Sequence, residues 1–208
     1  MNNIDSLVDA LPVLCLASAS PRRREILRQM GVPHVFASAD LDEALQYGEM
    51  PADYVLRLAT AKAQLIYSKY EPHSSIAMPV LGADTSVVFE GQILGKPKNL
   101  SDLKHMLGLL AGRKHEVITA VAVVNPSSLR TCLVRSEVVF RPISIVEIER
   151  YWASGEPRDK AGGYAIQGLG GVFIRRIKGS YSGIVGLPIF ETAELLTASG
   201  IPLWRPEL

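Results

Sequence analysis

The sequence VLCLASASPRRREILRQM, residues 13–30, decides the fold. Its first part, Val13 to Ala17, is a short apolar run typical of a buried strand. Pro21 to Met30 follows with helical spacing, with proline in the first turn and Gly31 directly after the end. A buried strand that leads through a short polar loop into a helix is the repeating unit of α/β proteins.

Strands and helices continue to alternate outward from this segment. Further strands are predicted over 34–37, 80–89, 92–94, 115–124, 131–140 and 172–177, and further helices over 51–69, 101–111, 144–154 and 188–199. The strands before and after Glu90-Gly91, and those before and after the turn at 125–128, are predicted to form antiparallel pairs. We therefore expect an α/β fold with a mixed, partly antiparallel sheet and flanking helices.

The composition is that of a globular protein. The chain has 208 residues, 48% of them hydrophobic and 21% charged, and it can bury a core without metal or disulfide support. Lys and Arg number 22 against 21 Asp and Glu, so the net charge of +1 provides no overall basic field for nucleic acid. Cys15 and Cys132 form no CxxC pair, which argues against a disulfide framework or a Cys-rich zinc site.

Neither apolar stretch of note predicts a membrane or export segment. Leu11 to Ala19 lacks the positive charge that precedes the apolar core of a signal peptide. Val117 to Val124 is too short to span a bilayer. We expect a soluble, cytoplasmic protein with no membrane partner.

The loop from Ser18 to Arg24 is the first candidate site. Free N–H groups at a helix start attract anions, and guanidinium groups bind phosphate strongly. Arg23 falls on the apolar face of the helix, near Ile26 and Leu27, where a cation is not expected for stability alone. A solvated basic cap is the alternative, but basic residues at a helix start oppose the helix dipole. The loop therefore favours phosphate binding.

Two further polar residues lie at apolar positions. Lys62 falls within the apolar stripe of the 51–69 helix, although a snorkelling lysine at the core edge fits the pattern equally well. Asp84 interrupts an apolar strand, which is costly unless the carboxylate is paired or binds a metal. Glu43, in an acidic loop, is a possible second carboxylate for Mg²⁺ or Mn²⁺. Together these residues predict a polyphosphate pocket with a metal-bound carboxylate.

Two common nucleotide-binding classes are excluded. Gly95-Lys96-Pro97 has the wrong spacing from Gly91 for a P-loop, and Pro97 replaces the hydroxyl residue that would hold Mg²⁺. The stretch 168–171 lacks the third glycine of a dinucleotide fingerprint and leads into a strand. The histidines have no metal-ligand spacing, and His105 and His115 are expected at surfaces or ends of elements.

Motifs along nearly the whole chain resemble the Maf family of nucleoside triphosphate pyrophosphatases. They are, in the order of the family, residues 16–23 (LASASPRR), 81–85 (LGADT), 95–97 (GKP), 154–157 (SGEP), 159–168 (DKAGGYAIQG) and 185–188 (VGLP). The resemblance covers about residues 13–200. It implies a single domain over residues 1–208, with two lobes around a deep cleft, a flexible N-terminal extension at residues 1–10, and a homodimer.

The resemblance also implies an activity and a set of site residues. The family hydrolyses the α–β phosphoanhydride of a nucleoside triphosphate to a monophosphate and pyrophosphate, with a divalent metal, Mg²⁺ or Mn²⁺. By resemblance Asp84 is the proton acceptor. The other matching positions are Lys62 and Lys96 as catalytic residues, Ser18, Arg22, Arg23, Thr85 and Gln167 as substrate-binding residues, and Asp84 with Glu43 as metal ligands.

Three positions separate the subtypes of the family. Arg22, Thr85 and Gln167 match the dTTP/UTP type, whereas the 7-methyl-GTP type carries an aromatic residue and an acid at the first and third. A glutamine amide can both donate to and accept from a uracil or thymine edge. The alternatives are the 7-methyl-GTP subtype and a nucleotide-sensing regulator of cell division or septum formation. RNA binding is disfavoured because aromatic residues are only 7% of the chain.

Overall fold

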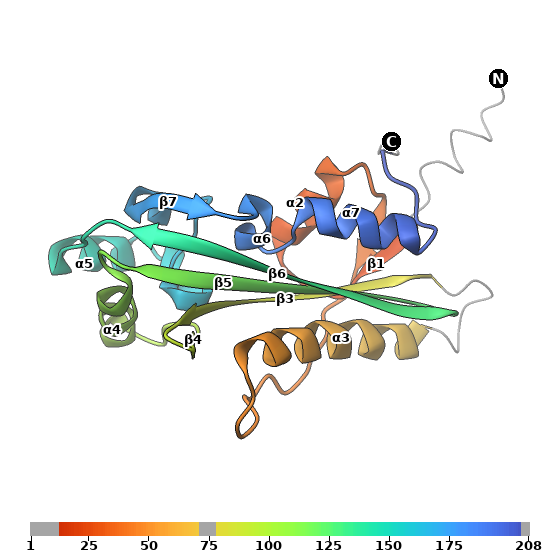
Figure 1. Cartoon of the computed structure of the whole chain (residues 1–208), viewed down its shortest axis with the longest axis horizontal. Coiled ribbons are helices and arrows are strands. Elements are labelled where there is room, and N and C mark those ends of the chain that lie inside the picture. The colour runs from red at the N-terminus through yellow and green to blue at the C-terminus, as the bar shows by residue number, and fades with distance from the viewer. Residues whose placement is uncertain (1–12, 71–77, 205–208) are drawn as a thin grey trace.

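The centre of the structure is a mixed sheet of seven strands (Figure 1). The computed structural model describes residues 13–70 and 78–204, so the predicted extension at 1–10 lies outside the described residues. The strands are ordered β2 (His34–Phe36), β1 (Leu14–Leu16), β3 (Val80–Phe89), β5 (Lys114–Asn125), β6 (Ser128–Phe140) and β7 (Ile174–Lys178), and β4 (Gln92–Leu94) pairs with β3. β1 is parallel to β2 and β3, and the other pairs are antiparallel.

Helices cover both faces of this sheet. Figure 1 shows α3 on one face, α2, α6 and α7 on the other, and α4 and α5 near one end of the long strands. Their bounds are α2 (Pro21–Gln29), α3 (Pro51–Tyr70), α4 (Leu100–Leu110), α5 (Ile145–Ala153), α6 (Tyr181–Val185) and α7 (Ile189–Ala198). The 3₁₀ turns are η2 (Glu156–Asp159), η3 (Ala161–Gly163) and η4 (Leu169–Phe173). Among the described residues, no helix combines the length and the apolar composition needed to cross a membrane.

The predicted mixed α/β architecture is confirmed, with local differences. The short helix α6 was not predicted, because five residues are too few to show a helical period. The last predicted strand begins later, at Ile174, because η4 takes up residues 169–173. Pro188 is the N-cap of α7 and not its first residue.

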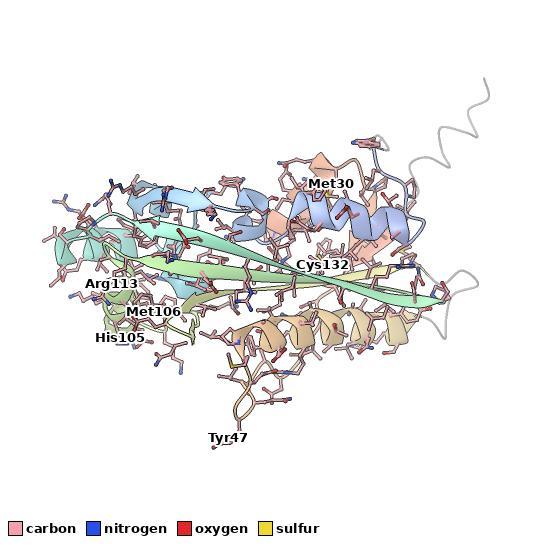
Figure 2. All side chains as sticks on the ribbon, in the orientation of Figure 1. Met30, Tyr47, His105, Met106, Arg113 and Cys132 are labelled. Carbon is pink, nitrogen blue, oxygen red and sulfur yellow. The ribbon has the colours of Figure 1, made fainter. Side chains whose placement is uncertain are left out.

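The two histidines lie where the sequence predicted, at a surface or at the end of an element. Figure 2 shows His105 on the outside of α4, where it is exposed. His115 is the second residue of β5, at the end of that strand, and its side chain is buried. Its Nε2 atom lies 2.8 Å from the hydroxyl of Tyr164, and its ring packs edge-on against Phe140. Burial lowers the pKa of His115 to about 4, so the ring is neutral.

The arrangement of β1 and β4 on β3 creates the opening for a site. Both strands pair with the same edge of β3, β1 at Val80 and Leu81 and β4 from Val87 to Phe89. Among the described residues, no strand pairs with that edge over residues 82–86. The chain leaves β1 and β4 toward this unpaired stretch, so the loops after both strands converge there.

α3 packs unusually close to β3. A Cβ atom on Gly82 would lie 2.2 Å from the carbonyl oxygen of Ala59, so only glycine allows this approach. Ala59 and Ala63 are fully buried against the sheet, together with Val55. The close contact places the side chain of the neighbouring Lys62 beside the middle of β3.

Candidate functional site

A cavity of about 980 Å³ opens where the loops after β1 and β4 meet β3. Every site residue predicted from the sequence contributes to its lining, namely Ser18, Arg22, Arg23, Glu43, Lys62, Asp84, Thr85, Lys96 and Gln167. These residues come from segments far apart in the chain. The structure therefore brings together the dispersed charges that the sequence predicted would converge.

The strand period of two divides the site between the faces of β3. Asp84 lies on the face covered by α3, whereas its neighbour Thr85 lies on the face of α2 and α6. Asp84 is 8% exposed although it lies within a strand of buried apolar residues. Two adjacent residues of one strand therefore serve two separate polar networks.

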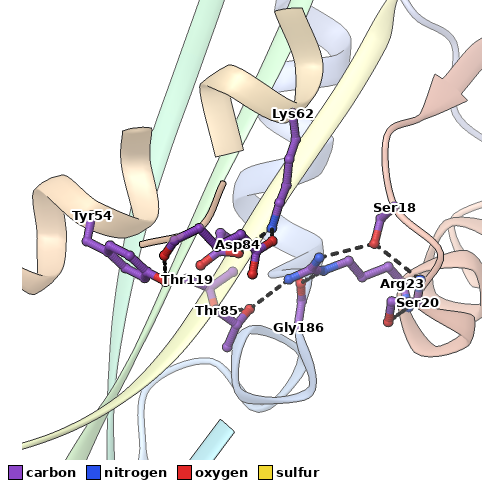
Figure 3. A network of polar contacts seen from close by, with 10 residues as sticks. Ser18, Ser20, Arg23, Tyr54, Lys62, Asp84, Thr85, Thr119 and Gly186 are labelled. Carbon is purple, nitrogen blue, oxygen red and sulfur yellow. Dashed lines mark hydrogen bonds and ion pairs between the residues drawn. The ribbon is translucent and has the colours of Figure 1, made fainter. Parts of the chain in front are cut away.

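The first network ties Lys62 to two carboxylates. Figure 3 shows the Lys62 side chain reaching from α3 to Asp84. The Lys62 ammonium lies 2.7 Å from Asp84 Oδ1 and 2.6 Å from Glu43 Oε1. Lys62 is 8% exposed, so the snorkelling alternative does not hold and the ammonium group is a buried partner of both acids.

The surroundings shift the two carboxyl groups in opposite directions. Burial raises the pKa of Asp84, and the nearby Lys62 and Arg23 only partly oppose this effect. Burial also acts to raise the pKa of Glu43, but the Lys62 hydrogen bond and the charges of Lys62, Lys96 and Arg23 outweigh it, and the pKa is lowered. Asp84 is thus the more basic of the two carboxylates, and Glu43 gives up its proton more readily.

The second network is centred on Arg23. Its Nε donates to the carbonyl of Gly186 at 2.8 Å, and its two terminal nitrogens donate to Ser18 Oγ and Thr85 Oγ1, each at 3.2 Å (Figure 3). Burial lowers the pKa of Arg23, and the charge of Asp84 opposes that shift. These contacts fix the guanidinium between the loop after β1, β3 and the end of α6.

The loop after β1 starts helix α2 as the sequence predicted. Ser20 is the N-cap, and its hydroxyl accepts a hydrogen bond from the backbone N–H of Arg23 at 3.5 Å. The Ser18 hydroxyl accepts from the backbone N–H of Ser20 at 3.2 Å. The helix start, the two hydroxyls and Arg23 thus lie together at one end of the cavity.

Two threonine hydroxyls, of Thr85 and Thr119, form a hydrogen-bonded chain that ends at Arg23. Thr119, opposite Thr85 on β5, donates its proton to the carbonyl of Gly183 at 2.8 Å. Its oxygen lies 3.0 Å from that of Thr85, so Thr85 donates to Thr119. Thr85 Oγ1 is then left to accept from Arg23. Thr85 is therefore oriented by the fold before any ligand binds.

Side chains of α3 hold the loop that carries Glu43. The hydroxyl of Tyr54 donates to the carbonyl of Glu43 at 2.9 Å, and Arg57 pairs with Glu49 and donates to the carbonyl of Ala44. Sequence analysis did not assign Tyr54 to the site. Its spacing of eight residues from Lys62, on the same helix face, was the available signal.

The remaining predicted residues lie on the rim. Lys96 and Gln167 are exposed and Arg22 is half-buried, and none of the three makes a side-chain hydrogen bond or ion pair with another described residue. Lys160, which sequence analysis did not assign to the site, also lines the cavity and pairs with Asp159. The rim therefore carries cations and an amide that are free to contact a ligand.

The donor set suits an oxygen-binding cation that arrives with a polyanion. Within the described residues, no group of three or more His, Cys, Asp or Glu side chains is placed to hold a metal ion. Asp84 and Glu43 provide two carboxylates on either side of Lys62. Mg²⁺ is commonly held by one or two carboxylates together with substrate phosphates, and these residues fit that pattern.

A mixed α/β fold with five cations, a helix start and a buried carboxylate around one cavity defines a protein that binds a polyphosphate. Residues 13–199 match the family model described as "Maf-like protein", so the chain belongs to the Maf family.

Relatives named "dTTP/UTP pyrophosphatase" resemble the chain over nearly its whole length. The one from Hahella chejuensis is 51% identical over 191 residues, 92% of this chain and 94% of the relative. The one from Pseudoalteromonas atlantica is 50% identical over 187 residues, covering 89% and 96%. The one from Colwellia psychrerythraea is 45% identical over 199 residues, covering 96% and 94%.

Proposed function

We propose that the protein is a nucleoside triphosphate pyrophosphatase that hydrolyses dTTP, UTP and modified uridine triphosphates to the monophosphate and pyrophosphate. Relatives at 45–51% identity carry the name dTTP/UTP pyrophosphatase. The observation that carries the proposal is the convergence of Arg23, Lys62 and Asp84 in one cavity. Its volume of about 980 Å³ lies at the upper end of the usual range for small-molecule sites.

The triphosphate lies along the start of α2 in this proposal. The N–H groups of the helix start and the Ser18 hydroxyl donate to phosphate oxygens. Arg22 and Arg23 neutralise charge from one side, and Lys62 and Lys96 from the other. Arg23 and Lys62 are fixed charges that need no rearrangement; they stabilise the charge that develops on the phosphates, and this effect supplies most of the acceleration.

Asp84 accepts the proton of the attacking water. A new P–O bond forms to the water oxygen, the α–β bridging bond breaks, and pyrophosphate leaves with the bond electrons. The raised pKa of Asp84 brings this carboxylate closer to the pH at which it works, which improves a general base. Lys62, at 2.7 Å, keeps Asp84 ionised and directs its free oxygen toward the cavity.

Asp84 and Glu43 are the residues that would hold Mg²⁺ or Mn²⁺. When bound, such an ion polarises phosphoryl oxygens as a Lewis acid. The ionised state of Glu43 suits this role, because metal ligands must be deprotonated.

Gln167 forms the hydrogen bonds that recognise the base in this proposal. Its side chain is exposed at the cavity rim, and its amide can accept from the N3–H of uracil or thymine and donate to a ring carbonyl. A carboxylate at this position only accepts, which suits a guanine edge. The glutamine therefore favours the pyrimidine substrates over 7-methyl-GTP.

A hydrolysis panel tests the proposal. Purified protein is incubated with UTP, dTTP, CTP, GTP and 7-methyl-GTP, with Mg²⁺ or Mn²⁺ or with a chelator, and pyrophosphate release is measured. We expect fast release from UTP and dTTP, and loss of release with the chelator. Preferred release from 7-methyl-GTP would contradict the base assignment, and no release from any nucleotide would favour the sensor alternative.

The proposal includes a cytoplasmic homodimer that recognises the nucleotide and no nucleic acid. Light scattering on the purified protein is expected to give twice the mass of the chain. A monomer at working concentration would contradict the dimer and leave the assignment of the reaction intact.

A further inference from the structure

A carboxylate outside the cavity organises the segment that carries Gln167. Glu156, the first residue of η2, accepts three hydrogen bonds. Its Oε1 accepts from the Tyr151 hydroxyl at 2.7 Å and from the backbone N–H of Gly170 at 3.0 Å. Its Oε2 accepts from the backbone N–H of Leu169 at 2.9 Å.

The segment bound by Glu156 has two sides. Residues 164–167 line the cavity, whereas residues 168–170 lie against Glu156 and Tyr151. Glu156 and Tyr151 themselves are not part of the cavity lining. The hydrogen bonds to Glu156 therefore begin two residues after Gln167, at Leu169, where the backbone has left the cavity lining.

Residues 164–170 pack tightly against Glu156 and Tyr151, which together are called the anchor. A Cβ atom on Gly168 would lie 2.2 Å from Glu156 Oε2. A Cβ atom on Gly170 would lie 2.6 Å from the Tyr151 hydroxyl oxygen. The same hydroxyl also accepts from the backbone N–H of Ala165 at 3.2 Å. The anchor thus touches the segment on both sides of Gln167.

The carboxylate is held in its ionised form by these donors. Burial acts to raise the pKa of Glu156, but the hydrogen bonds from Gly170, Tyr151 and Leu169 outweigh it, and the pKa is lowered. Within the described residues Glu156 makes no ion pair, so its bonds are directed to the backbone of the segment and to Tyr151. A charged acceptor makes stronger bonds than a neutral one.

We propose that Glu156, supported by Tyr151, is a positioning residue that sets the base selectivity of the site by fixing the backbone beside Gln167. This inference rests on the proposed function, because it assumes that Gln167 contacts the base. The phosphate-binding groups come from the loop after β1, from α2, from α3 and from the loop after β4, whereas the Glu156 carboxylate bonds to Tyr151, Leu169 and Gly170. Loss of the anchor is therefore expected to change recognition of the base and to leave the chemical step intact.

The test is the variant Glu156→Gln in the full-length protein, with UTP and CTP as competing substrates. The amide has one oxygen acceptor in place of two, and its NH₂ group faces a backbone N–H. We expect KM for UTP to rise about tenfold, corresponding to the loss of roughly one hydrogen bond to a charged group. We expect kcat to stay within about twofold and the preference for UTP over CTP to fall.

Glu147→Gln is the matched control. Glu147 also accepts three hydrogen bonds, from the backbone N–H and the hydroxyl of Ser144 and from Arg141, but it lies outside the cavity lining. We expect this variant to lower the melting temperature and to leave the ratio of UTP to CTP activity unchanged. Equal effects of both variants on that ratio would overturn the proposal, because Glu156 would then act only on stability.

Tyr151→Phe keeps the proposal testable if Glu156→Gln fails to fold. It removes one donor to Glu156 and the acceptor for Ala165. We expect a smaller change in the same direction, with KM for UTP raised about threefold. An unchanged UTP to CTP ratio in a folded Tyr151→Phe would overturn the proposal.

The failure of this inference can be distinguished from failure of the proposed function. If the wild-type protein does not distinguish UTP from CTP, or if Gln167→Ala does not change the ratio, the assignment of the base contact is wrong. If wild type and Gln167→Ala behave as expected and only Glu156→Gln has no effect, the positioning role alone is wrong.

Discussion

The inner wall and the rim of the cavity differ in how their charges are held. Lys62, Asp84 and Arg23 are each fixed by contacts of 2.7–3.2 Å to other parts of the protein. Arg22, Lys96 and Gln167 make no such side-chain contacts with other described residues. The side chains of the inner wall are held by the protein before a ligand binds, whereas these three rim side chains are not. Substitutions in the two regions should therefore have effects of different size and kind.

Removal of the proposed proton acceptor should have the largest effect. Asp84→Asn keeps the size of the side chain and its place beside Lys62 but accepts no proton. We expect kcat to fall about a thousandfold with nucleotide binding retained. Turnover measurements and calorimetric titration with UTP check this. Full activity of a correctly folded Asp84→Asn would contradict the role of the inner wall.

Removal of Lys62, the buried partner of Asp84, should have the next largest effect. Lys62→Met leaves Asp84 and Glu43 without their shared cation, and kcat/KM is expected to fall about a hundredfold. The pKa of Asp84 is already raised by burial, so activity increases as pH rises through that pKa. Without Lys62 the pKa rises further. In a plot of kcat/KM against pH, the acidic limb should move to higher pH. An acidic limb at the wild-type pH would show that Lys62 does not influence the pKa of Asp84.

The rim residue Gln167 should show an effect on recognition. Gln167→Glu replaces a donor and acceptor with an acceptor alone, so we expect kcat/KM for UTP to fall about thirtyfold, mainly through KM. The melting temperature should remain that of the wild type, because the side chain is exposed. A large loss of stability would show that this position belongs with the inner wall.

The exposed cation of the rim should show the smallest effect. Lys96→Ala removes one solvent-exposed charge, which is expected to raise KM about threefold at low ionic strength. Because exposed charges are screened by salt, the difference from wild type should shrink at about 0.5 M salt. Measurement of KM at two ionic strengths checks this. If the rise in KM does not depend on salt, Lys96 contacts the reacting phosphate directly.

The same contrast explains what the sequence could reveal. Arg23, Lys62 and Asp84 were visible because each is a charged residue at a position where periodicity demands an apolar one. The two antiparallel pairs could be anticipated from the turns that join their strands, at Glu90-Gly91 and at residues 125–128. These signals are local, so a single sequence is enough to read them.

Other features depend on residues that only packing brings together. The carbonyl of Gly186 that accepts from Arg23 lies at the end of α6, which is too short to be recognised from its sequence. Glu156 reads as an ordinary polar residue, and its role emerges only where the backbone of residues 168–170 returns to it. The burial of His115 was not predicted, because its partner Tyr164 is 49 residues away.

The close approach of α3 to Gly82 makes the site sensitive to substitution at a residue that carries no charge. Gly82 on β3 contributes no side chain to the site, but it lets the Ala59 carbonyl of α3 come close to the strand that carries Asp84, and so sets the distance between Lys62 and Asp84. A single added methyl group there would push the lysine off the aspartate without altering any charged residue. The reactivity of the pocket is therefore sensitive to a position that inspection of its polar groups alone would pass over.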